Sequence, residues 1–117
     1  MTFRIELICV KEDGTEERRE VLTIAKEQLA LETLGLTIEE GKTLLANVQA
    51  CVVEQQTTAS LEHHRRCAEC GRKHRSKGQG QSTVQTLFGP VTVPNPRWQR
   101  CVCQGKSPQT FRPTAQW

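Results

Sequence analysis

The sequence predicts an α+β fold: an N-terminal β-hairpin plus helices, one of them long, followed by a small zinc-ribbon-like β module. Residues 2–10 alternate apolar and polar side chains, an Asp-Gly turn follows, and residues 16–24 form the predicted return strand, with Val21, Leu22 and Ile24 apolar. Residues 38–61 repeat apolar side chains at three- and four-residue steps, as a helix does. Two closely spaced cysteine pairs flank a second predicted hairpin, as in small modules that fold around a metal.

The first predicted hairpin places Phe3, Ile5 and Leu7 on one face of a strand, and Asp13-Gly14 supplies the turn. A two-stranded hairpin alone is marginally stable in water, so one face needs a covering helix. The hairpin therefore predicts a covering helix further along the chain.

Two helices are predicted after the hairpin. Residues 25–34 combine good helix formers with apolar leucines, and Gly35 suits a C-terminal cap. Thr37 and Glu40 then have the spacing of a capping box, which opens the long helix. The apolar stripe of that helix most simply packs on the hairpin; the alternatives are an arm between two modules or a dimer contact.

The sequence of the second half predicts short strands and loops. Residues 76–82 indicate a glycine-rich loop, 83–87 a strand and 91–93 its returning partner. Residues 104–117 are polar and predict little regular structure. The apolar residues of this half are too few for a self-sufficient core. Modules of this size usually need an additional cross-link, such as a bound metal ion.

The predicted cross-link is a structural zinc ion with four cysteine ligands, Cys67, Cys70, Cys101 and Cys103. The histidines His63, His64 and His74 are alternative ligands, but a closed four-cysteine site leaves them as surface residues. Cys9 and Cys51 stand in apolar contexts and are expected to be small buried side chains.

Charge is divided unevenly along the chain. Residues 1–62 carry twelve acidic and six basic side chains, a balance of −6, and residues 63–117 carry ten basic and one acidic, a balance of +9, which together give the net +3. The division predicts an acidic hairpin-and-helix module at 1–62 and a basic zinc-ribbon module at 63–117. The basic residues clustered around the first cysteine pair are expected to contact DNA phosphates: Arg65, Arg66, Arg72, Lys73, Arg75 and Lys77.

Several motifs in chain order resemble the N-terminal zinc-ribbon region of ISKra-type insertion-sequence transposases. They are Leu34-Gly35-Leu36-Thr37, the run from His64 to Arg72, Arg75-Ser76-Lys77-Gly78, Thr86-Leu87-Phe88-Gly89 with Val91, Cys101-x-Cys103-Gln104, and Thr110-Phe111 with Pro113. The resemblance implies DNA transposition, with a separate ribonuclease-H-like domain that carries an Asp/Asp/Glu triad. This chain has one aspartate, Asp13, in a predicted turn, so it is expected to be non-catalytic and to lack that domain, as a truncated relative or an N-terminal part.

The expected partners are DNA and, through the acidic half, a second copy or a transposase catalytic domain; no membrane partner or small-molecule substrate is expected. The N-terminus lacks an export signal, which predicts a cytoplasmic protein with reduced thiols. One alternative is a zinc-ribbon adaptor with a dimerising helix and no nucleic-acid role. Another is a redox or hydrolytic enzyme that uses Cys67 and Cys70, for which no supporting strand-helix frame is predicted.

Overall fold

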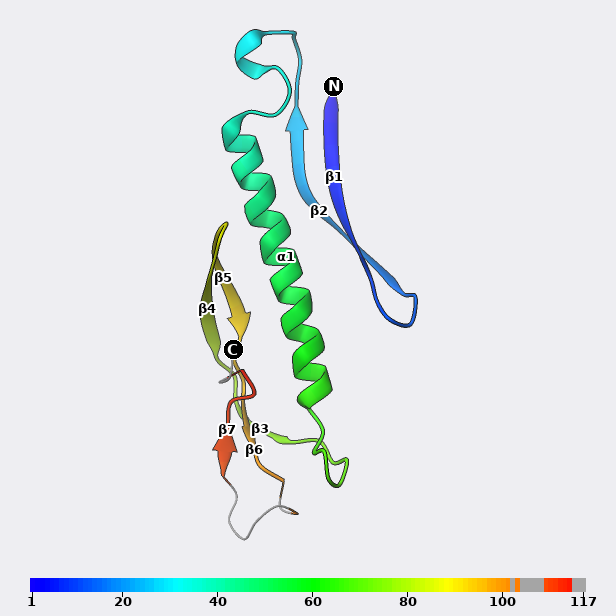
Figure 1. Cartoon of the computed structure of the whole chain (residues 1–117), viewed down its shortest axis with the longest axis vertical. Helices are drawn as coiled ribbons and strands as arrows, with labels where there is room; N and C mark the ends of the chain where they lie inside the picture. The colour runs from blue at the N-terminus through cyan, green and yellow to red at the C-terminus, as the bar shows by residue number, and fades with distance from the viewer. Residues whose placement is uncertain (102, 104–108, 115–117) are drawn as a thin grey trace. The chain divides into compact units, whose positions relative to one another are not determined.

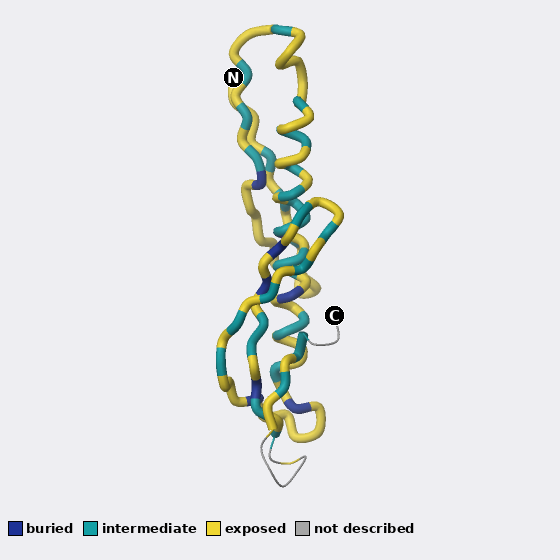
Figure 2. Tube along the Cα trace, turned by 90° about the vertical axis from the view of Figure 1, so that its left-hand side faces the viewer, coloured by how far each residue is buried: buried dark blue, intermediate teal, exposed yellow. Residues whose placement is uncertain are grey.

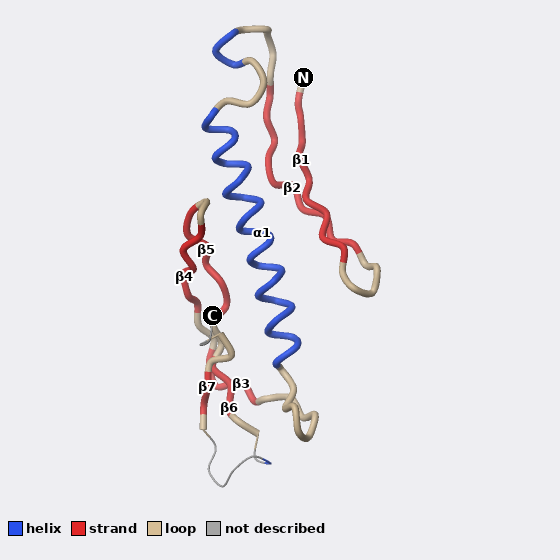
Figure 3. The backbone as a smooth tube through the Cα atoms, in the orientation of Figure 1, coloured by secondary structure: helices blue, strands red, loops and turns tan. Residues whose placement is uncertain are grey.

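The computed structural model describes residues 1–101, 103 and 109–114, and it contains strands, one long helix and a cysteine-rich β module (Figures 1 and 3). This is the predicted α+β fold. The chain divides into two compact units, Met1–Cys51 and Val52–Trp117, called here the N-terminal and C-terminal units. The division falls inside the long helix; the module boundary after residue 62 stays a prediction from charge.

The N-terminal unit opens with the predicted antiparallel hairpin of β1 (Thr2–Val10) and β2 (Glu16–Ala25). Gly14 turns the chain with a φ of +88°, and the Lys11 N–H donates to the Thr15 carbonyl across the loop at 2.8 Å. The Asp13 carboxylate accepts from the Thr15 backbone N–H at 2.8 Å, which fixes the turn. The register shifts between Ile5 and Glu6, a bulge in the β1–β2 ladder.

The helix predicted over residues 25–34 is wrong. Only a single 3-10 turn forms there, Leu31–Thr33, and the flanking backbone is extended. Leu29 and Leu31 are 91% and 89% exposed, so packing of these leucines contributes little to holding a helix. Intrinsic propensity cannot hold so short a helix in water, because nucleation is costly and tertiary packing supplies most helical stability.

The long helix α1 (Ile38–His64) begins with the predicted capping box. The Glu40 N–H donates to the Thr37 hydroxyl at 3.1 Å, and the Glu40 carboxylate accepts from the Thr37 N–H at 2.9 Å. Two further contacts attach the start of α1 to the end of the hairpin. The Lys26 ammonium lies 2.7 Å from the Glu40 carboxylate, and the Asn47 side chain donates to the Val21 carbonyl at 2.7 Å.

Beyond the end of α1, the C-terminal unit contains two antiparallel sheets. Strand β4 (Gln81–Thr86) pairs with β5 (Gly89–Pro94), close to the predicted strands. The other strands form a three-stranded antiparallel sheet in the order β3 (Arg75–Gly78), β6 (Arg97–Gln99) and β7 (Thr110–Phe111).

The loop predicted at residues 76–82 is therefore wrong, since most of that segment belongs to β3 and β4. The prediction failed because Gly80 allows the close approach of another backbone segment, whereas the glycines were interpreted as marking a loop. The Asn95 N–H donates to the Gly80 carbonyl at 2.8 Å, and a Cβ on Gly80 would lie 2.9 Å from the Asn95 carbonyl oxygen. Strand β7 also lies within the segment expected to have little regular structure; residues 104–108 and 115–117 lie outside the described residues.

Few side chains are buried in either unit (Figure 2). In the described part of the N-terminal unit, the buried apolar side chains are Val21 and Cys51. In the C-terminal unit they are Cys67, Val91, Val93 and Trp98. None of the helical residues described forms a segment long and apolar enough to cross a membrane.

Candidate metal centre

The first cysteine pair lies on a tight backbone turn that local hydrogen bonds define. The Cys67 N–H donates to the Arg72 carbonyl at 2.8 Å, and the Gly71 N–H donates to the Cys67 carbonyl at 2.9 Å. Gly71 adopts a φ of +75°, a conformation that glycine reaches without steric cost. The Arg66 guanidinium donates to the Gly71 carbonyl at 3.0 Å and closes the outside of the turn. Cys67 and Cys70 are thus held at fixed positions by the residues between and around them.

The second pair lies beyond the end of β6, where the chain leaves the three-stranded sheet. The Arg100 N–H donates to the Gln109 carbonyl at 2.6 Å and continues the pairing of β6 with β7. Cys101 follows directly, so the sheet sets its position. Because β6 also pairs with β3, which begins shortly after the first turn, the sheet brings the two cysteine pairs to the same end of the unit.

The four sulfur atoms form one cluster. The Sγ atoms of Cys67, Cys70, Cys101 and Cys103 all lie within 4.8 Å of one another. Cys67 Sγ is 3.6 Å from Cys103 Sγ, and Cys70 Sγ is 3.2 Å from Cys101 Sγ. These separations are well beyond the roughly 2.05 Å of a disulfide bond. Four converging thiols at this spacing form a set that could hold one metal ion.

The thiols perturb one another's protonation. A hydrogen bond from the Cys103 backbone N–H, followed by one from the Cys70 side chain, lowers the pKa of Cys101 below its ordinary value. The neighbouring Cys101 sulfur, followed by Cys70, raises the pKa of Cys103 far above its ordinary value. Without a cation, repulsion between negative charges prevents four sulfurs this close from all ionising. A bound divalent cation offsets this repulsion and favours the thiolate form of each cysteine.

An aromatic cluster packs beside the cysteine turns. Trp98, 3% exposed, stacks on the His74 ring at 5.9 Å between ring centroids, and Phe111 meets both rings edge-on. The Arg65 guanidinium covers the Trp98 ring at 5.0 Å, a cation–π contact. Trp98 therefore packs within the module.

His74 was expected at the surface, and that expectation is wrong. It is 9% exposed, and its Nδ1 has no hydrogen-bond partner among the described residues. The Trp98 ring stacks on the imidazole and the Phe111 ring meets it edge-on at 5.0 Å, so aromatic packing buries the histidine. The metal-ligating group found among the described residues contains cysteines alone; His63 and His64 are exposed at the end of α1.

The six basic residues predicted to contact phosphate fall into two groups. Arg65 and Arg66 are occupied by the Trp98 ring and the Gly71 carbonyl. The remaining four are exposed around the first turn and along β3: Arg72, Lys73, Arg75 and Lys77.

The structure adds Arg97 to this exposed set. In β6 it points away from the buried Trp98, as successive side chains of a strand alternate, and it lies on the same sheet face as Arg75. The alternation in Arg97-Trp98-Gln99 was the available sequence signal, but a run of three residues is too short to identify as a strand.

The other two cysteines lie apart from the cluster. Cys51 is 4% exposed, as expected for a small buried side chain, whereas Cys9 on β1 is only half-buried, so the same expectation is wrong for Cys9. The fold and the site together define a small α+β protein with a four-cysteine cluster that could bind a metal ion. Comparisons with models of known families, with curated proteins and with solved structures find no match to this chain.

Proposed function

We propose that this chain is a non-catalytic, zinc-stabilised DNA-binding part of a transposase-like protein. The observation that carries the proposal is the four-sulfur cluster, whose Sγ atoms lie within 4.8 Å of one another, set in a turn surrounded by exposed arginine and lysine. The metal holds the turn in shape, and the turn holds the positive charges where a phosphate backbone can meet them.

Zinc is the metal that suits this donor set best. Four thiolates with a tetrahedral arrangement are a frequent structural zinc site, and Zn–S bonds of about 2.3 Å imply sulfur separations of roughly 3.8 Å. The separations of 3.2 Å and 3.6 Å, with all pairs inside 4.8 Å, need only small side-chain adjustments to meet that value. Cys67, Cys70, Cys101 and Cys103 would hold the ion, which would tie the first turn to the end of the sheet.

Duplex DNA is the partner that the charge distribution favours. Arg72, Lys73, Arg75 and Lys77 have exposed side chains, and Arg97 extends this positive surface across the sheet. Contacts between such residues and phosphates supply affinity and orientation but little base specificity. Binding of this kind releases counterions, so affinity falls steeply as salt rises.

The test measures DNA affinity of the zinc-loaded chain by fluorescence anisotropy over a salt series. Replacing Arg72 or Arg75 with glutamine should lower the slope of log K against log salt by about 1 for each phosphate that the variant no longer neutralises. Arg18→Gln is the matched control, because Arg18 lies on β2 with a side chain 63% exposed and the same charge is removed. Equal effects of the three substitutions, or no salt-dependent binding, would contradict the DNA proposal.

The transposase parentage draws its support from the motif string alone, above all the run around Cys67 and Cys70 and the Thr86-Leu87-Phe88-Gly89 hairpin. Two-metal cleavage needs clustered carboxylates, and the chain has a single aspartate. The proposed role is therefore binding, with catalysis supplied by another domain or chain. A reading frame that continues into a segment with spaced acidic residues would support this parentage.

One observation favours a different class, a protein-interaction adaptor. Leu29, Leu31 and Leu34 are more than half exposed, which is unusual for a group of neighbouring leucines and typical of a protein-binding surface. The two proposals separate cleanly, since the adaptor predicts zinc binding with no salt-dependent retention on DNA.

A further inference from the structure

The two edges of the β1–β2 hairpin differ in how well they are protected against pairing with a further strand. The β2 edge carries five consecutive charged residues, Glu16 to Glu20, and the Asn47 side chain of α1 donates to the Val21 carbonyl. Both features block the addition of a further strand there, because charge and cover are the usual protections of a sheet edge. The β2 edge is therefore closed by the chain itself.

The β1 edge has neither protection. Strand β1 is nine residues long, contains no proline or glycine, and carries only Arg4 and Glu6 as charged side chains. Among the described residues, β2 is its sole strand partner. A long, regular edge of this kind presents unpaired backbone donors and acceptors, and a two-stranded sheet is itself only marginally stable.

We propose that a second copy of this chain pairs with this edge, β1 to β1 and antiparallel, to form a four-stranded sheet. A two-fold axis through Ile5 places Arg4 of each copy opposite Glu6 of the other. Axes through the neighbouring positions bring like charges together: one through Arg4 opposes the two arginines, and one through Glu6 opposes the two glutamates. Charge complementarity thus selects a single register.

The surroundings of Glu6 within the hairpin favour a pair with Arg4 of the second copy. Within the hairpin it lies directly opposite Glu20, and like charges in that position destabilise a sheet. The nearby compensating charge is Arg18, whose guanidinium is 4.0 Å from the Glu6 carboxylate and largely exposed. Arg4 makes no ion pair within the part of the chain that the structure describes. An Arg4–Glu6 pair across the dimer satisfies both residues.

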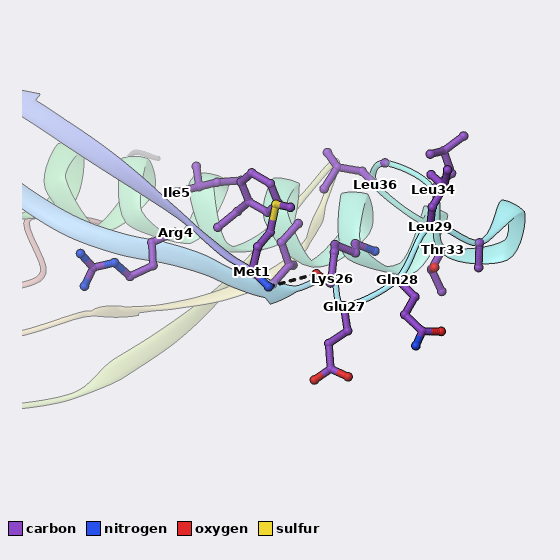
Figure 4. A pocket seen from close by; sticks show the side chains of 14 residues that line it. Met1, Arg4, Ile5, Lys26, Glu27, Gln28, Leu29, Thr33, Leu34 and Leu36 are labelled. Carbon is purple, nitrogen blue, oxygen red and sulfur yellow. Dashed lines mark hydrogen bonds between the residues drawn. The ribbon is translucent and has the colours of Figure 1, made fainter.

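The apolar residues match in the same register. Phe3 of one copy faces Leu7 of the other, and the two Ile5 side chains meet at the axis. Phe3 is 48% exposed in the single chain, so pairing removes apolar surface from water. Phe3 and Ile5 also line an open apolar cavity of about 580 Å³ with Ile24, Leu34 and Leu36 (Figure 4), so the paired face continues into an apolar surface already present.

The test follows the association of the zinc-loaded full chain by sedimentation velocity at low salt. Wild type should dimerise with an affinity that falls as salt rises. Arg4→Glu and Glu6→Arg should each weaken the dimer by roughly 10- to 100-fold, because two attractive pairs become two repulsive ones. The double variant R4E/E6R restores opposite charges and should regain the dimer, and an equimolar mixture of R4E with E6R should form a heterodimer.

Lys42→Glu is the matched control, since it makes the same charge change on α1 at a side chain 72% exposed. It should leave dimerisation unchanged. A wild type that stays monomeric at its highest soluble concentration would overturn the proposal. So would a dimer that R4E weakens no more than K42E does, or a double variant that fails to recover, since either result places the contact elsewhere.

Discussion

Replacing Cys70 with serine tests whether metal binding holds the C-terminal unit together. Cys70 is exposed, so its side chain contributes little packing, and the substitution changes one sulfur to one oxygen. Any large loss of structure must then come from the loss of a metal ligand. A background of Trp117→Phe leaves Trp98 as the single tryptophan, whose ring is 3% exposed and reports directly on the aromatic cluster.

The expected magnitude follows from how little else is buried. Val91, Val93 and Trp98 are the buried apolar side chains of the described C-terminal unit apart from Cys67. Burial of three such side chains contributes about 5–9 kcal/mol before conformational entropy is subtracted. A structural zinc contributes on the order of 10 kcal/mol coupled to folding, so the proposed ion would be the largest single stabilising contribution in this unit.

The assay combines metal content with Trp98 fluorescence. Cys70→Ser should purify with much less than one equivalent of zinc, and Trp98 emission should shift to the red as the ring meets water. Chelator added to the wild type should produce the same shift. Cys9→Ser is the matched control, a cysteine outside the cluster, and it should keep both zinc and the native emission.

A metal-free Cys70→Ser chain with unshifted Trp98 emission and an unchanged thermal transition would refute this reasoning. It would mean that the aromatic cluster and the β-sheet are sufficient without the ion.

Three further outcomes are expected. Thr37→Ala should cost about 1 kcal/mol of stability through loss of the helix cap, whereas Thr58→Ala, at an exposed position inside α1, should cost nothing measurable in chemical denaturation followed by circular dichroism. Glu40→Gln should lower stability at neutral pH, because the hydrogen bond from the Lys26 ammonium and then that from the Thr37 N–H hold the pKa of Glu40 below its ordinary value. That stabilisation is fully present above the unfolded pKa of about 4.3 and is lost as the pH falls through the lower folded pKa, so the two chains should converge in acid; a gap that persists there would contradict the assignment. Val93→Ala, at a residue 1% exposed, should destabilise the C-terminal unit by about 1–3 kcal/mol in thermal denaturation.

Local signals in the sequence predicted the elements whose causes are local. The Asp13-Gly14 turn predicted the first hairpin, and Thr37 with Glu40 predicted the start of α1, because in each case neighbouring residues supply the hydrogen bonds. The spacing within each cysteine pair likewise predicted a metal-ligating turn, and Gly71 fits that turn through its positive φ.

The failed predictions all depended on contacts between residues distant in sequence. Residues 25–34 have helical propensity, but packing of their exposed leucines contributes little, so only one 3-10 turn forms. Gly80 indicated a loop from composition, whereas the Asn95 backbone pairs with it closely. His74 was expected to be exposed, but β6 and β7 bring Trp98 and Phe111 against its ring.

Residue identity by itself determined the chemistry that this protein has available: four thiols in two close pairs, a single aspartate, and an acidic half followed by a basic one. Only the tertiary structure decided that the two pairs converge and that Arg65 and Arg66 have structural contacts while Arg75 and Arg97 share an open face. The physical reason is that sequence spacing fixes geometry across a turn of a few residues. The distance between Cys70 and Cys101 is instead set by the pairing of β3, β6 and β7.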